Sequence, residues 1–107
     1  MTPVDGHAEE EEEEEQEEEV DEYNQLHGAV AKAVLDYLAR NIVDDPDNVA
    51  IELDEGRRGD IRLSLHVAPE DMGKVIGRRG RTAQALRAVV RAAGAREGAE
   101  VSVDIVD

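Results

Sequence analysis

Apolar side chains recur every three or four residues from Leu26 to Ile42, which predicts an amphipathic helix. Two aspartates and a proline, Asp44-Asp45-Pro46, end this pattern. We expect one face of the helix to pack inward. The apolar residues that define this face are Leu26, Val30, Val34, Tyr37, Leu38 and Ile42.

Alternation with a period of two replaces the helical spacing further along the chain. Apolar residues occupy every second position in 49–54 and again in 61–67, with polar or small residues between them. The turn sequence Gly56-Arg57-Arg58-Gly59 separates the two stretches. This pattern predicts two strands joined as a hairpin, each with one solvated face, and the same alternation in 101–105 predicts a last strand.

Two helices are predicted between the second and the last strand. Pro69 suits the first position of a helix and is followed by two acids, so we expect a short helix over 69–76 that Gly77 ends. The next helix is expected to begin after Gly80 and to end near Gly94. Its inward stripe consists of Ala83, Leu86, Val90 and Ala93, and its outer face carries Gln84, Arg87 and Arg91.

The order of elements is therefore α-β-β-α-α-β, without an internal repeat. Because helices and strands do not alternate regularly, we predict an α+β domain of two layers. Its three-stranded sheet is expected to be antiparallel or mixed, with the helices packed on one face.

Charge divides the chain into two parts. Residues 1–25 hold thirteen of the 27 acidic residues and no lysine or arginine, which predicts a disordered acidic tail. The folded domain is assigned to 26–107. Two interpretations of the tail remain open: a solubilising segment, or a competitor for a basic site at the high local concentration that a tether provides.

A basic cluster lies within the folded part, because 72–96 contains seven cations and no acid. Gly77 and Gly80 enclose Arg78 and Arg79, and glycines let a nucleic-acid backbone lie close to a loop and to the helix N-terminus that follows. A GxxG sequence alone is weak evidence. Its position between two predicted helices favours phosphate binding over a plain helix–helix turn.

The stretch Val67–Thr82, with Lys74-Val75-Ile76-Gly77-Arg78-Arg79-Gly80-Arg81 at its centre, resembles bacterial type II KH domains. The resemblance covers about 28–107 and is closest to KhpA-type proteins, which consist of little more than one KH domain. It implies a type II KH fold with a groove for about four single-stranded nucleotides. The acidic N-terminal extension departs from the pattern of these small proteins.

The resemblance also assigns residues to this groove. The clamp on the RNA backbone consists of Gly77, Arg78, Arg79 and Gly80, and Ile76 lies at the apolar floor of the groove. Charge and spacing, rather than the motif, add Lys74, Arg81 and Arg87 as candidates for contacts with flanking phosphates. For Arg87 and Arg91, an ordinary solvated helix surface is at least as good an interpretation.

Relatives of this type are RNA chaperones that self-associate and pair with a second KH protein of the KhpB type, also called Jag. They influence RNA expression, cell-wall homeostasis and cell length. The resemblance thus implies single-stranded RNA and a KhpB/Jag-type protein as partners, and allows a homodimer. The alternative is a protein-interaction adaptor that mainly pairs with another KH protein and for which RNA contact is incidental.

Missing residue types narrow the function further. The chain has no cysteine, which excludes a disulfide framework and thiolate chemistry. No serine or histidine is placed as a nucleophile or base, and no histidine has a partner at a metal-ligand interval, so we predict no enzymatic activity, cofactor or metal. No apolar stretch approaches the ~20 residues that span a bilayer, and we expect a cytoplasmic protein without membrane insertion.

Overall fold

The computed structural model describes residues 28–107. The predicted disorder of 1–25 and the predicted helix start at Leu26 lie outside these residues. The elements are a first helix over 28–42, the short 3-10 helix η1 (Pro46–Asn48), the strands β1 (Ala50–Glu55) and β2 (Ile61–His66), the 3-10 helix η2 (Pro69–Asp71), the helix α2 (Met72–Ile76), the 3-10 turn η3 (Arg78–Gly80), the helix α3 (Arg81–Arg96) and the strand β3 (Val101–Ile105).

The three strands form one mixed sheet in the order β1-β2-β3. Strands β1 and β2 are antiparallel, with Leu53 opposite Leu63, whereas β2 and β3 are parallel, with Leu63 opposite Val103. A parallel pair needs a crossover connection, and α2 and α3 provide it. The sequence predicted an antiparallel or a mixed sheet, and the sheet in the structure is mixed.

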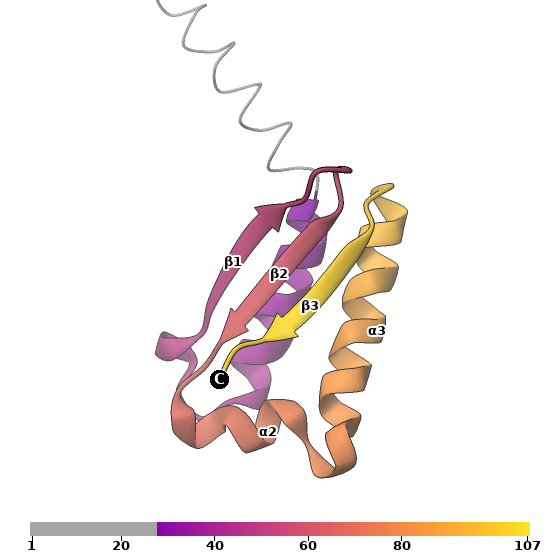
Figure 1. Cartoon of the computed structure of the whole chain (residues 1–107). Coiled ribbons are helices and arrows are strands. Elements are labelled where there is room, and N and C mark those ends of the chain that lie inside the picture. Colours follow the sequence, from indigo (N-terminus) through magenta and orange to yellow (C-terminus); the bar gives the residue numbers. More distant parts are fainter. Residues whose placement is uncertain (1–27) are drawn as a thin grey trace, which may run out of the picture.

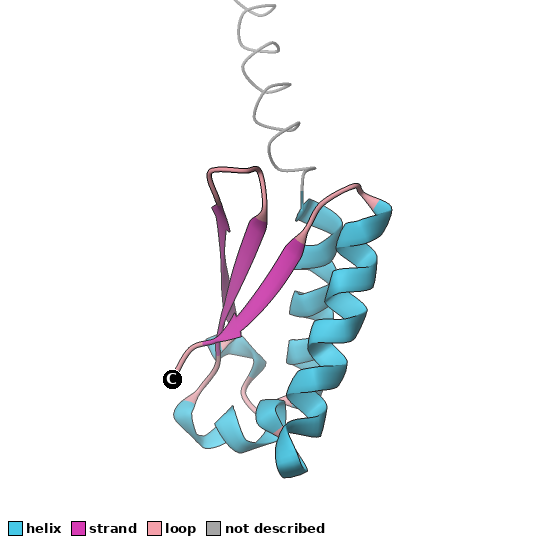
Figure 2. Ribbon diagram, turned by 45° about the vertical axis from the view of Figure 1, so that its right-hand side comes forward, coloured by secondary structure: helices cyan, strands magenta, loops and turns pink. Residues whose placement is uncertain are grey.

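The helices cover one face of this sheet. The first helix and α3 lie side by side on that face, and the other face carries no element of the described chain (Figures 1 and 2). The predicted α+β fold with the order α-β-β-α-α-β and helices on one side is confirmed.

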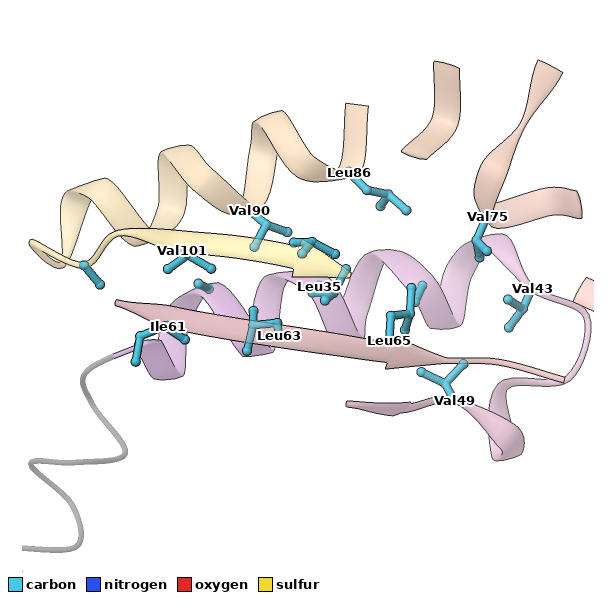
Figure 3. Close-up of a cluster of buried hydrophobic side chains, with 14 residues drawn as sticks. Leu35, Val43, Val49, Ile61, Leu63, Leu65, Val75, Leu86, Val90 and Val101 are labelled. Atoms are coloured by element: carbon cyan, nitrogen blue, oxygen red, sulfur yellow. The ribbon is translucent and has the colours of Figure 1, made fainter. Parts of the chain in front are cut away.

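The core lies between the two layers and is centred on β2. Ile61, Leu63 and Leu65 of this strand are almost completely buried, because every second side chain of a strand points to the same face. They pack with Leu35 of the first helix and Val90 of α3 (Figure 3). The intervening polar positions of β2 face the open side of the sheet.

The inward face of the first helix differs from the prediction. Ala31, Leu35 and Ala39 are fully buried, whereas Val30 and Tyr37 are 49% and 67% exposed. Small alanine side chains allow the helix to lie close to the sheet, so the buried stripe is not the stripe with the largest apolar residues. The predicted positions Val34, Leu38 and Ile42 pack only at the border of the core.

The end of α3 also differs from the prediction. The helix continues through Gly94 to Arg96, and the glycine with a positive φ that follows the helix is Gly98, at 76°. Gly94 is buried because β3 passes close to it, and a Cβ added at this position would overlap with the Val101 side chain. This glycine marks close packing rather than a helix end.

A substitution at Gly94 tests this close approach. We expect Gly94→Ala to lower the free energy of unfolding by about 1 to 3 kcal/mol, because the added methyl group forces α3 and β3 apart. The matched control is Gly73→Ala in α2, where an added Cβ meets open space. That change is expected to be neutral or to stabilise by up to about 1 kcal/mol through helix propensity. Urea denaturation measures the stability of both variants, and equal effects would contradict the close packing of Gly94 against β3.

Candidate nucleic-acid interface

The predicted GxxG loop forms the corner between α2 and α3, at the end of the molecule opposite the β1–β2 turn (Figure 1). The Gly77 N–H donates to the carbonyl of Gly73 at 2.9 Å and ends α2, as the sequence predicts. The Gly80 N–H donates to the Gly77 carbonyl at 3.1 Å and closes the turn before α3 begins at Arg81.

The two glycines of this corner serve different purposes. Gly77 has φ 75° and ψ 174°, and a Cβ there would overlap with the side chain of Thr82, so both the backbone and the space require glycine. Gly80 has φ 72° with open space around it, so only the backbone conformation favours glycine. The corner is therefore tight at Gly77 and open to solvent at Gly80.

Arg79 adopts a left-handed conformation with φ 59° and ψ 25° and is the one non-glycine residue with positive φ in 28–107. This conformation costs a residue with a Cβ roughly 1 to 2 kcal/mol. Such strained residues cluster at functional sites, where the surroundings maintain them. Nothing in the sequence indicates this strain, because glycine would be the residue expected at such a position.

The corner concentrates positive charge in an accessible place. Arg78, Arg79 and Arg81 are exposed, and none of them forms an ion pair with a carboxylate among the described residues. The first turn of α3 carries no acid, and no side chain caps it at Gly80. The Arg81 N–H, the first of α3, already donates to the carbonyl of Arg78. The start of α3 therefore offers an anion such as a phosphate mainly the positive end of the helix dipole.

Ile76 adds an apolar surface beside this charge. It is the last residue of α2 and is 41% exposed, while the preceding Val75 is fully buried in the core. An exposed aliphatic side chain next to a phosphate-binding loop offers a surface for the face of a base. Ile76 directly precedes the four loop residues, and its place at the floor of a groove for RNA stays a prediction.

The other cations predicted to contact RNA phosphates are less available for such contacts. Lys74 Nζ forms an ion pair with the carboxylate of Asp44, so its charge is partly neutralised. Arg87 is half-buried between α3 and β3, and its Nε donates to the carbonyl of Val103 on the edge strand at 3.3 Å. Arg87 lies about 9 Å along the helix axis from Arg81. Arg91 lines a hollow at the other end of α3, away from the loop.

Asp71 is a residue of this region whose role the sequence did not reveal. It is 3% exposed, and its carboxylate accepts hydrogen bonds from the N–H groups of Asp44 and Asp45 at 3.2 and 3.0 Å. These bonds attach the start of α2 to the segment that follows the first helix. A buried carboxylate without such donors would be costly, so the contact fixes the position of α2.

Other kinds of site find no support in the described part of the chain. Among residues 28–107, no group of three or more histidine, aspartate or glutamate side chains is placed to hold a metal ion. Within the same range, no helix has both the length and the apolar character of a bilayer-spanning segment.

Comparison with known proteins identifies the family. A family model described as the KH domain of KhpA/KhpB matches residues 32–105, which include the corner and all three strands. The chain belongs to the KhpA/KhpB family of KH domains. The predicted resemblance to KhpA-type single-domain proteins is confirmed, and the acidic N-terminal residues precede the matched range.

Several curated relatives cover most of this KH domain. The proteins named RNA-binding protein KhpA from Halalkalibacterium halodurans and Mycobacterium tuberculosis are each 48% identical, over 77 and 79 residues. These matches cover 71% and 74% of this chain and 99% and 94% of the relatives. The protein of that name from Streptomyces coelicolor is 52% identical over 73 residues, or 68% of this chain and 87% of its own. No solved structure matches significantly.

The strain at Arg79 is testable by substitution. We expect Arg79→Gly to raise the free energy of unfolding by about 0.5 to 1 kcal/mol, because relief of the left-handed strain exceeds the larger entropy that glycine loses on folding. Arg78→Gly is the matched control, since Arg78 has no positive φ. It is expected to destabilise by about 0.5 to 1 kcal/mol. Thermal or urea unfolding measures the change in the free energy of unfolding for each variant. If both variants change it in the same direction, Arg79 is not strained.

The anchoring role of Asp71 gives a second prediction. Asp71→Ala leaves two partly buried N–H groups without their acceptor and is expected to cost about 1 to 3 kcal/mol of stability. The exposed neighbour provides the control, because Glu70→Ala should change stability by less than about 0.5 kcal/mol. Amide hydrogen exchange at Asp44 and Asp45 should accelerate only in the Asp71 variant. Unchanged exchange there would refute the anchor.

Proposed function

We propose that this KH domain binds single-stranded RNA at the corner between α2 and α3 and catalyses no reaction. The observation that carries the proposal is the set of exposed arginines that have no ion pair within 28–107, at a glycine-permitted corner that opens onto the N-terminus of α3. The names of the KhpA relatives, which describe RNA-binding proteins, support it.

In this proposal each part of the corner has its own task. The backbone of Gly77 and Gly80 lets the RNA backbone approach, Arg78, Arg79 and Arg81 contact phosphates, and Ile76 faces a base. Four nucleotides provide roughly three or four phosphate contacts, so the log–log slope of affinity against salt should be about −2 to −3. Arg87 and Lys74 contribute less, because both already have partners in the protein.

The family resemblance also suggests partners and a cellular role for this domain. A single corner of this size binds weakly, and two KH domains joined in a homodimer, or in a complex with a KhpB/Jag-type protein, would gain affinity by avidity. Such a complex would act as an RNA chaperone in the cytoplasm and would influence RNA expression, cell-wall homeostasis and cell length.

A second function is favoured by a different surface. Val30 and Tyr37 of the first helix and Val89 of α3 are large apolar side chains that are 49%, 67% and 49% exposed. Exposed apolar residues on the helical layer suit a contact with another protein. The rival proposal is therefore an adaptor that pairs with another KH protein and contacts RNA only incidentally.

The chain contains a matched control for testing RNA binding. The sequence Gly-Arg-Arg-Gly occurs twice, at 77–80 in the corner and at 56–59 in the β1–β2 turn. We expect Arg78→Asp/Arg79→Asp to weaken binding of a labelled single-stranded RNA by about 10- to 100-fold, or about 1.4 to 2.8 kcal/mol. Aspartate tolerates the left-handed conformation at position 79, so the fold should persist.

The control variant Arg57→Asp/Arg58→Asp makes the same change of net charge at the other copy. It should retain the affinity to within about threefold, because the turn lies at the opposite end of the domain (Figure 1). Fluorescence anisotropy at low and physiological salt measures both variants. Equal loss in the two would indicate a general effect of charge, and no RNA binding by the unmodified chain would favour the adaptor.

A further inference from the structure

The charge of this chain is unevenly distributed. Residues 28–107 contain fourteen acidic and twelve basic residues, so the described domain is nearly neutral. Ten glutamates lie within 9–19, whereas α3 and the corner before it contain only basic charged residues. The chain therefore carries, within one molecule, a strongly anionic segment and a cationic surface of the kind that binds anions.

The structure shows where the acidic segment joins the domain. The Glu97 carboxylate, just after α3, accepts hydrogen bonds from the N–H groups of Val30 and Ala31 at 3.0 and 3.4 Å. The chain therefore enters the domain beside the C-terminal end of α3. The corner lies at the other end of this sixteen-residue helix, about 24 Å away.

The acidic segment is long enough to cover that distance. Glu19 and Glu9 precede Gly28 by nine and nineteen residues, so an extended chain would carry them at most about 30 Å and about 65 Å from it. Every glutamate of 9–19 has the reach to contact the corner. Exposed Arg96 near the entry point and Arg81 near the corner place positive charge at both ends of the path along α3.

The β1–β2 turn is a competing position for the acidic segment, because it carries the same tetrapeptide. Its arginines, however, are flanked by Glu55 and Asp60, which offset their charge. The corner has no acid from 72 to 96 and has in addition the positive end of the α3 dipole. Charge complementarity therefore favours the corner.

We propose that the glutamates of 9–19 occupy the α2–α3 corner of their own chain and that an RNA must displace them to bind. The competition with RNA rests on the proposed function, whereas the contact between the glutamates and the corner does not. A tether supplies an effective concentration near millimolar, so a weak acidic ligand competes well with short or weak RNAs and poorly with tight ones. The segment thereby makes RNA binding selective.

The contact is tested first without RNA. In the full-length chain, Glu→Ser substitutions at all ten glutamates of 9–19 remove the charge, and amide NMR compares this variant with the unmodified protein. We expect chemical-shift changes at Gly77, Arg78, Arg79 and Gly80 that are independent of protein concentration and that disappear in high salt. The copy of the tetrapeptide at 56–59 is the internal comparison and should shift less than 77–80, although it lies at the end of the domain where the segment enters.

Three results of this experiment would overturn the proposal. Absence of shifts at 77–80 would mean that the segment does not occupy the corner. Shifts confined to 56–59 would place the segment at the β1–β2 turn. Shifts that grow with protein concentration would mean that it binds a second copy instead of its own chain.

The consequence for RNA is tested by anisotropy. The Glu→Ser variant should bind a short single-stranded RNA about 3- to 10-fold more tightly at low salt and equally at high salt. Tighter binding without the amide shifts would indicate long-range repulsion and would overturn the proposed contact. Equal binding that still depends on Arg78 and Arg79 would overturn the competition and leave the RNA function intact. If neither protein binds RNA, the proposed function fails, and the amide shifts alone decide whether the segment occupies the corner.

Discussion

The burial of one face of β2 is the constraint on which the rest of the domain depends. Ile61, Leu63 and Leu65 are the central residues of the core. Strands β1 and β3 pair with β2 on its two sides, and the first helix and α3 contribute buried side chains to the same core. Strand β3 pairs with the edge of β2 that β1 leaves free, and it runs parallel to β2. This parallel pairing requires the two helices of the crossover, and the corner is the point where the crossover changes direction.

Much of this fold is predictable because strands and helices have different hydrophobic periods. The alternation in β1, β2 and β3 identified each strand and its buried face. The pattern failed where small residues determine packing. Ala31 and Ala39 lie against the sheet although Val30 is more hydrophobic, and Gly94 permits the approach of β3 although glycine usually suggests a helix end. Close approach is a tertiary property that a linear pattern does not contain.

The candidate site, like the fold, is predictable from the sequence only in part. The GxxG sequence and its positive charge located the corner, because both depend on residues that are adjacent in the chain. The strain at Arg79 and the anchor at Asp71 depend on backbone angles and on partners about 27 residues away, so no local signal reveals them. The second Gly-Arg-Arg-Gly illustrates the same point, since identical residues form a hairpin turn in one place and a helical corner in the other.

The parallel pairing of β2 and β3 has a consequence for the folding reaction. The β1–β2 hairpin closes over a short turn, whereas β3 reaches its partner only after the whole stretch 67–100. The chain loses the entropy of closing this long loop before the contacts of β3 compensate for it, so we expect β3 to dock after the hairpin has formed. The corner lies in the middle of that loop and sets the direction in which the chain returns. The residues that shape the basic surface are therefore also residues that the folding reaction must arrange before the sheet is complete.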